Sequence, residues 1–417
     1  MYSLLIASKK RLRSSLSFFY QPLKSYLLSA VGVLPVSSKI LGYPKGFHRS
    51  SLDFVKNTTV NSVNQYTEVY PSQTIYRARP KTVHETIDWR FLTGYLGSFV
   101  TPSSFILTVR NARVVGSDGV VITPDDKLLA DVSIEGGVIP DNAEQHSIFR
   151  KLKLPKVTRT SETVAVLAAM GGSNYFHWMF DILPRIHLLQ KSEYIKKTDK
   201  FLINKLVANY QTETLDILGI TNDQLIQSDS SLHIEVANLI IPSLPGITGN
   251  MTKWSCNFLR ESFLLGQEAT KVDRLERIYI SREKAAYRRV LNEAEVIRIL
   301  NDLGFVVVSF EKLSVVEQAA VMSSAKVVVS PHGAGLTNLV FCSQGCKVIE
   351  LFAPNYVNPC YRALCDMVGL EYWYLLGKGQ PPLKPSDDHL IKSIKDNIEI
   401  DINTLLKTLT VAKLTTK

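Results

Sequence analysis

Two short stretches of this chain hold polar side chains at spacings that suit acid–base chemistry or ligand binding. The first, residues 173–185, contains Asn174, His177, Asp181 and Arg185. In a helix these four positions share one face, and His177 and Asp181 lie one turn apart. Such a pair can orient one another or together face a substrate hydroxyl as a general base. The alternative is a buried hydrogen-bonded pair that only fixes the helix.

The second stretch, residues 330–341, follows an apolar β-branched run that is typical of a buried parallel strand. Glycines in a turn let the backbone approach a ligand closely, and free amides at the start of a helix attract phosphate. The spacing differs from the three-glycine dinucleotide fingerprint and from the phosphate loop. A purely structural turn is the alternative. The candidate ligand contacts are His332, Gly333, Ala334, Gly335, Thr337 and Asn338.

Basic side chains form a third group, in the loop after the strand expected over 277–281. Arginines at the carboxyl end of a strand are placed to meet an anion, which makes Arg282 and Arg289 candidate phosphate contacts. A solvated basic loop is the alternative. Glu350 stands near the end of the strand expected over 347–352, where an acidic residue can accept hydrogen bonds from a ribose. Its alternative role is a buried partner of an arginine.

Two motifs resemble a known family. The run HGAGLTN at 332–338, followed by an apolar strand ending in Glu-Leu-Phe, and the run NYFHWMFD at 174–181 are similar to recurrent stretches of glycosyltransferase family 61. The resemblance covers roughly residues 100 to 405. It implies two Rossmann-like domains facing a cleft, the GT-B arrangement, and transfer of a sugar from a nucleotide-sugar donor to a hydroxyl of a glycan, with inversion at the anomeric carbon.

On that resemblance each candidate residue receives a role. Asp181 is the expected general base, assisted by His177, and Asn174 and Arg185 support the acceptor side. The diphosphate is expected to rest on the amides of 333–335 with Thr337 and Asn338. Arg282 and Arg289 neutralise its charge and Glu350 holds the ribose. The donor sugar is not fixed, because the family uses xylose, arabinose and N-acetylglucosamine.

The elements that must position these residues follow an α/β rhythm. A short strand at 164–168, a Gly-Gly turn and a helix carry the first motif, and alternating strands and helices surround the second. We divide the chain into a basic amphipathic arm and connecting segment (1–99), an acceptor-side α/β domain (100–245), a linker (246–272), a nucleotide-sugar-binding Rossmann-like domain (273–380) and a helical tail (381–417).

Composition narrows the chemistry. Hydrophobic residues make up 45% and charged residues 21% of 417 positions, which is typical of a globular protein with a large core. The five cysteines have no zinc-site spacing, and reduced thiols in a cytosolic protein are expected. No Asp-x-Asp pair occurs. We therefore expect a metal-independent enzyme with no cofactor, whose co-substrate is a nucleotide sugar, in our prediction a UDP-sugar.

Charge is concentrated at the N-terminus. Residues 1–50 carry eight Lys or Arg and no acidic residue, so that 10 minus 8 leaves +2 for the rest of the chain. Residues 2–28 have leucines at helical spacing, a pattern that suits a basic helix on an anionic membrane surface or one docked on the protein's own core. A transit peptide is a third interpretation. No pattern indicates nucleic-acid binding.

These features predict a cytoplasmic protein, peripheral at the inner membrane face, that acts on a lipid-linked glycan in capsular-type polysaccharide biosynthesis. Two other classes remain as alternatives. An inactive carbohydrate- or nucleotide-binding scaffold would keep the core and lose the polar residues. An NAD(P) oxidoreductase would share the βαβ rhythm but needs a third glycine after the strand.

Overall fold

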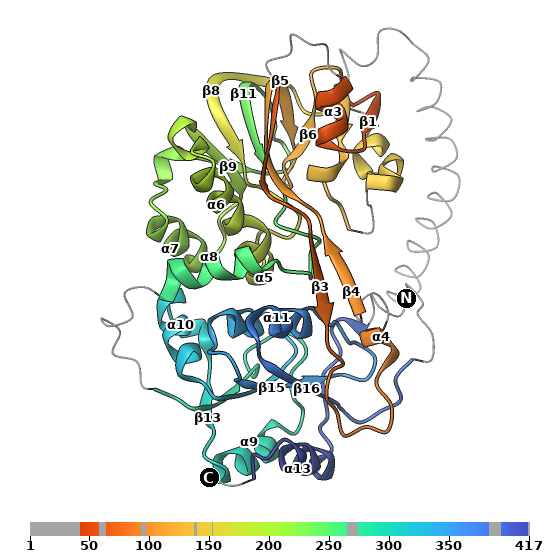
Figure 1. Ribbon diagram of the computed structural model, residues 1–417, viewed down its shortest axis with the longest axis vertical. Helices are drawn as coiled ribbons and strands as arrows, with labels where there is room; N and C mark the ends of the chain where they lie inside the picture. Colours follow the sequence, from red (N-terminus) through yellow and green to blue (C-terminus); the bar gives the residue numbers. More distant parts are fainter. Residues whose placement is uncertain are drawn as a thin grey trace, which may run out of the picture.

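The computed structural model describes residues 42–57, 64–92, 97–136, 140–151, 153–264, 274–382 and 393–415. The expected amphipathic helix at 2–28 lies outside these residues, as do parts of the expected linker and tail. Two α/β halves are stacked along the long axis of the molecule (Figure 1). The α/β class predicted from the sequence is therefore confirmed.

The upper half is built on a mixed sheet with nine strands among the described residues, in the order β1-β7-β6-β5-β11-β8-β9-β10, with β2 also paired to β5. Strand β11 pairs parallel with β8 and antiparallel with β5. Strands β5 and β6 form an antiparallel hairpin. The strands are β1 (Gly46–His48), β2 (Gln65–Tyr70), β5 (Ser104–Val115), β6 (Val120–Ile122), β7 (Lys127–Leu129), β8 (Thr158–Val166), β9 (Lys200–Asn204), β10 (Leu225–Ser228) and β11 (His233–Pro242).

Helices cover one face of this sheet. They are α5 (Tyr175–His177), η4 (Trp178–Ile182), α6 (Leu183–Lys191), η5 (Tyr194–Lys197), α7 (Asn209–Ile217) and α8 (Lys253–Leu264). The Asn174 side chain caps the first helical turn by accepting a 2.9 Å hydrogen bond from the Phe176 amide. Pro184 follows a π-helical turn, η4, and enters α6 near its start. The wider turn accommodates the proline ring without breaking the helix.

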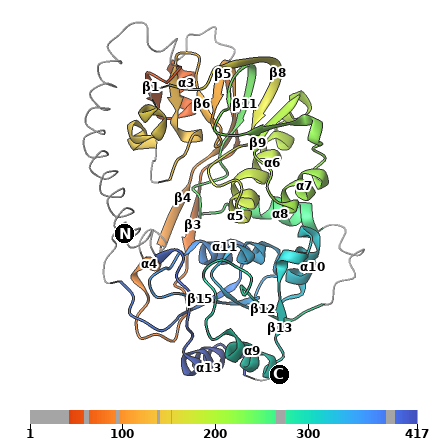
Figure 2. The same cartoon turned by 180° about the vertical axis from the view of Figure 1, so that it is seen from behind.

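The lower half holds a five-stranded parallel sheet in the order β13-β12-β14-β15-β16. Numbered along the chain this is 2-1-3-4-5, a doubly wound order. Helices α9 and α13 pack on one face, and α10, η9 and α11 pack on the other, toward the upper half (Figures 1 and 2). The elements are β12 (Arg277–Ile280), α9 (Glu293–Asp302), β13 (Val306–Val308), α10 (Val315–Ser324), β14 (Val327–Pro331), η9 (Ala334–Phe341), β15 (Lys347–Phe352), α11 (Cys360–Val368), β16 (Glu371–Leu376) and α13 (Ile402–Val411).

An N-terminal segment ties the halves together. The hairpin of β3 (Gln73–Arg77) and β4 (Gly97–Thr101) runs from the upper half to the lower one (Figure 1). Between these strands, Lys81 pairs with the edge of β16, and α4 (Trp89–Leu92) buries Phe91 against Tyr374, with ring centroids 4.4 Å apart. Part of the segment expected only to connect therefore completes the core of the lower half.

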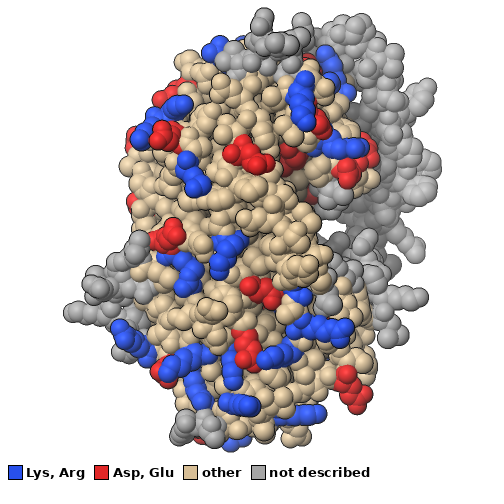
Figure 3. Space-filling model, in the orientation of Figure 1, with Lys and Arg blue, Asp and Glu red and all other residues tan. Residues whose placement is uncertain are grey.

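The surface has no large region of a single charge in the view of Figure 3, where both signs are interspersed and Lys and Arg are more frequent over the lower half. All five cysteines are buried and free. Within the described ranges, no helix is both long enough and apolar enough to cross a bilayer.

Candidate active site

A cavity of about 440 Å³ lies between the two halves. Its floor is the point where strand order reverses, between the carboxyl ends of β12 and β14, which is where doubly wound sheets bind ligands. The upper half contributes Asn174, Phe176, His177, Thr248 and Gly249 to its lining. The lower half contributes Arg282, Tyr287, Arg288, His332, Gly333, Ala334, Tyr356, Asn358, Cys360, Tyr361, Ile394 and Lys395.

His177 faces this cavity, and Asp181 lies behind it. The Nδ1 atom of His177 is 2.7 Å from Asp181 Oδ2, and the Thr248 hydroxyl donates to the same oxygen over 3.3 Å. Asp181 is buried and is not among the cavity-lining residues. The carboxylate therefore fixes the imidazole with Nδ1 as the donor, and Nε2 is left to meet a ligand. The sequence placed the pair one turn apart, and the structure brings the two side chains together.

The histidine ring rests on a glycine turn. A β-carbon on Gly171 would lie 2.7 Å from His177 Cδ2, and this residue has a positive φ of 75°. Both features require glycine, because a side chain would push the ring aside and strain the backbone. The Gly-Gly turn expected from the sequence thus sets the position of His177.

Two arginines enter the cavity from the loop after β12. Buried Nε atoms of Arg282 and Arg288 have no hydrogen-bond partner among the described residues. The Arg288 guanidinium lies over the rings of Tyr287 and Tyr356, at 4.9 and 5.3 Å from their centroids. Burial and the neighbouring Arg288 lower the pKa of Arg282. Unsatisfied donors of this kind, beside a cavity, form a site for an anion.

Arg289 lies elsewhere. Its side chain is exposed and does not line the cavity, whereas Arg288, next to it, does. The backbone of Arg288 has a positive φ of 56°, which turns consecutive side chains in directions that strand or helix periodicity does not predict. Lys395 is a further cation that sequence reasoning missed. It reaches the cavity from a segment more than a hundred residues after the arginines, and no local pattern signals that contact.

The glycine turn after β14 contributes to the cavity only through its first residues, His332, Gly333 and Ala334. The guanidinium of Arg282 crosses directly over Gly333, in the space that a β-carbon would occupy. Gly335 packs toward Ile280 instead, where a β-carbon would lie 3.2 Å from its Cγ2. The absence of a side chain at Gly333 therefore leaves room for the Arg282 guanidinium, and the turn also supplies free backbone amides.

Thr337 and Asn338 are fully buried and do not line the cavity. The Thr337 hydroxyl lies 3.5 Å from that of Tyr361. The Asn338 amide oxygen accepts from the Tyr175 hydroxyl at 2.8 Å, and its nitrogen donates to Gln318 at 2.7 Å. The bond between Tyr175 and Asn338 joins the two halves, whereas the other two contacts lie within the lower half. The expected contact of Thr337 and Asn338 with a diphosphate stays a prediction that this geometry does not favour.

A second histidine–carboxylate pair faces the cavity from the lower half. His332 Nδ1 lies 2.5 Å from Glu350 Oε1, and the Tyr372 hydroxyl donates to Glu350 Oε2 at 2.6 Å. Glu350 is fully buried, with both oxygens engaged inside the protein. This geometry favours the alternative of a buried partner over a ribose contact, although the partner is a histidine. Burial lowers the pKa of His332.

Arg185 has a supporting position. It is buried, and its guanidinium donates to the carbonyl oxygens of Leu167, Ala168 and Pro242. Burial lowers its pKa to about 9. The side chain holds the carboxyl ends of β8 and β11 against α6, behind the cavity.

Comparison with known proteins assigns the central segment of the chain to a family. Residues 175–349 match the family model described as Glycosyltransferase 61. These residues belong to glycosyltransferase family 61. The resemblance recognised in the sequence is thereby confirmed, and the family 61 segment includes His177, Asp181, Arg282, Arg288 and the whole glycine turn.

Curated proteins that are similar to parts of this chain carry glycosyltransferase names. Protein O-linked-mannose β-1,4-N-acetylglucosaminyltransferase 2 of Canis lupus familiaris is 29% identical over 33% of this chain and 24% of its own. EGF domain-specific O-linked N-acetylglucosamine transferase of Drosophila melanogaster is 38% identical over 22% and 18%. A β-1,2-xylosyltransferase of Oryza sativa subsp. japonica is 28% identical over 59% and 48%. The matches span less than half of each of these relatives.

Proposed function

We propose that this protein is an inverting, metal-independent glycosyltransferase that moves a sugar from a nucleotide-sugar donor to a hydroxyl of a glycan acceptor. One observation carries the proposal. A carboxylate-oriented histidine from the upper half and two arginines with unpartnered nitrogens from the lower half line the same cavity. Two α/β halves on either side of that cavity support a GT-B arrangement. The names of the relatives support sugar transfer.

The donor diphosphate is assigned to the lower half. Arg282 and Arg288 supply charge-assisted hydrogen bonds, and the backbone at Gly333 and Ala334 lies at the start of η9, where free amides favour an anion. Lys395 adds a third positive charge. The described lining residues include no carboxylate to hold a cation. Arginines therefore balance the charge of the diphosphate, and a UDP-sugar remains the donor that we propose.

His177 is assigned as the general base. Its Nε2 takes the proton from the acceptor hydroxyl as the oxygen attacks the anomeric carbon, on the side opposite the diphosphate. The bond between that carbon and the diphosphate oxygen breaks, and the developing negative charge passes to the arginines. Asp181 stabilises the imidazolium that forms, over 2.7 Å. The sequence led us to expect Asp181 as the base and His177 as its assistant. We exchange these two roles because His177 lines the cavity and Asp181 lies behind it.

The transfer reaction tests this proposal. The full chain is incubated with UDP-xylose or UDP-N-acetylglucosamine and neutral oligosaccharide acceptors in excess EDTA, and the anomeric configuration of the product is read by NMR. We expect transfer with inversion at an undiminished rate. Retention of configuration, or activity that EDTA abolishes and Mg²⁺ or Mn²⁺ restores, would contradict the proposal. The lipid-linked acceptor, the capsular-type pathway and the cytoplasmic location stay predictions.

A further inference from the structure

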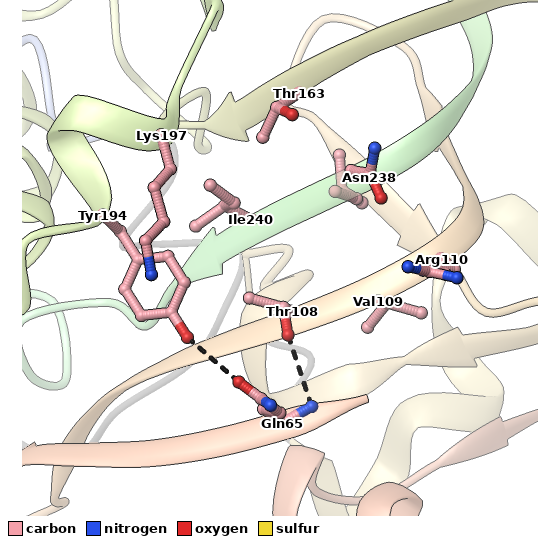
Figure 4. A pocket seen from close by; sticks show the side chains of 10 residues that line it. Gln65, Thr108, Val109, Arg110, Thr163, Tyr194, Lys197, Asn238 and Ile240 are labelled. Atoms are coloured by element: carbon pink, nitrogen blue, oxygen red, sulfur yellow. Dashed lines mark hydrogen bonds between the residues drawn. The ribbon is translucent and has the colours of Figure 1, made fainter. Parts of the chain in front are cut away.

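A second pocket, of about 250 Å³, lies on the sheet of the upper half, away from the interdomain cavity (Figure 4). Strands β2, β5, β8 and β11 form its floor, and η5 forms one wall. The lining residues are Gln65, Thr108, Val109, Arg110, Thr163, Tyr194, Lys197, Asn238, Leu239 and Ile240. Strand register places Thr163, Asn238 and Arg110 in one row across three strands.

The polarity of this floor is unusual for its position. The same face of the sheet carries Ile106, Ala165 and Ile240, which are buried in the core under the helices. On each strand the next residue of this face, two positions away, is polar: Thr108 on β5, Thr163 on β8 and Asn238 on β11. The pocket opens at these three residues. Alternation along a strand would continue the apolar face. The change of polarity therefore coincides with a concave surface.

An irregularity in the sheet helps to build the row. Register between β8 and β11 shifts between Val236 and Asn238, so that one strand carries an extra residue there. Such bulges re-aim side chains and occur often beside binding sites. Here the shift places the Asn238 amide beside Thr163, facing the pocket (Figure 4).

Charge in this pocket has one sign. Arg110 and Lys197 stand on opposite sides of it (Figure 4). The Lys197 ammonium is held 4.8 Å above the ring of Tyr194, and the Tyr194 hydroxyl contacts Gln65 at 3.4 Å. Neither cation forms an ion pair with a residue that the structure describes, and the lining includes no carboxylate. Two cations, two amides and several hydroxyls suit an anionic group that carries hydroxyls.

We infer that this pocket is a glycan-binding site for an acidic sugar residue. The carboxylate or sulfate of that residue meets Arg110 and Lys197, and its hydroxyls meet Asn238, Thr163 and Gln65. The helical run from His177 to Tyr194 separates the site from the cavity by on the order of 25 Å, at 1.5 Å per residue. Binding at this site does not depend on the proposed transfer reaction.

Titration calorimetry with the full chain tests the inference. The probes are a glucuronate-containing oligosaccharide, its sulfated form and a neutral oligosaccharide of equal length. We expect the acidic chains to bind and the neutral chain to bind at least about 10-fold more weakly, because charge-assisted hydrogen bonds to arginine are lost. The two acidic probes separate a carboxylate site from a sulfate site, and preferential binding of either one supports the inference.

Variants locate the binding. Arg110→Gln and Lys197→Gln are each expected to weaken binding of the acidic chain about 10-fold. Arg159→Gln is the matched control, since Arg159 is an exposed arginine of β8 outside the pocket. The affinity for a nucleoside diphosphate should be the same in these three variants, because none of the three residues lines the interdomain cavity. Equal affinity for neutral and acidic chains, no binding at millimolar concentration, or an equal loss in Arg159→Gln would overturn the inference.

Discussion

The hydroxyl of Tyr175 donates a 2.8 Å hydrogen bond to the amide oxygen of Asn338, and this bond joins the two motifs of the chain across the interface between its halves. The amide nitrogen of Asn338 in turn donates a 2.7 Å hydrogen bond to Gln318 of α10. Burial raises the pKa of the Tyr175 hydroxyl, so it stays protonated as a donor. The motif residues thus act partly by fixing how the halves meet.

Tyr175→Phe is expected to lower the free energy of unfolding by about 1–3 kcal/mol, because the buried Asn338 oxygen loses its donor. Urea denaturation measures the change. Tyr76→Phe is the control, since the Tyr76 side chain is 80% exposed. Equal stability of the two variants would show that the bond between the halves contributes nothing.

His177→Ala is expected to reduce kcat by about 10²–10⁴-fold, the usual contribution of a general base. Asp181→Asn should reduce kcat as well, because the amide no longer stabilises the imidazolium. Neither change should alter nucleoside-diphosphate affinity, since the arginines are untouched. Steady-state kinetics and calorimetry measure both quantities. Wild-type kcat in His177→Ala would exclude the histidine as the base.

Gly333→Ala is expected to displace the Arg282 guanidinium, because a methyl group would occupy its path. The affinity for a nucleoside diphosphate should fall by about 10-fold, the value of one charge-assisted bond. Gly46→Ala provides the control, since no atom lies within 4 Å of the added carbon. An unchanged affinity in Gly333→Ala would mean that Arg282 does not contact the diphosphate.

Stability should decline as the pH falls below about 6.5, and His84 contributes to this decline. Its Nε2 accepts a 3.0 Å hydrogen bond from the Leu376 amide, which protonation would break. Burial lowers the pKa of His84 below its ordinary 6.5. The unfolded chain therefore takes up the proton first, and the stabilisation present above pH 6.5 is lost as the pH falls through the folded-state pKa. His84→Gln keeps an acceptor and should flatten the decline in thermal unfolding between pH 5 and 7. Parallel curves for wild type and variant would contradict this.

Local signals in the sequence predicted the elements that carry the site. The Gly-Gly turn and the apolar run before the second turn each specify their own conformation within a few residues, and the pairing of His177 with Asp181 follows from helical spacing. The parallel sheet followed from the βαβ rhythm.

Contacts between distant segments could not be predicted in this way. Whether Arg288 or Arg289 enters the cavity depends on one left-handed backbone residue, and Lys395 arrives from the far end of the chain. The sequence shows that Asn338 is a polar residue in an apolar segment, but it does not indicate that its hydrogen-bond partner is Tyr175. The docking of the segment around Lys81 on β16 likewise depends on tertiary pairing alone.

Calorimetric titration of UDP in EDTA, into wild type, Arg288→Ala and Arg289→Ala, tests the central claim most directly. The two arginines are adjacent in sequence, and only Arg288 lines the cavity. The account predicts that UDP binds without metal, that Arg288→Ala weakens binding by at least about 10-fold, and that Arg289→Ala binds like wild type. A loss in Arg289→Ala with none in Arg288→Ala, or no UDP binding by the wild type, would contradict it.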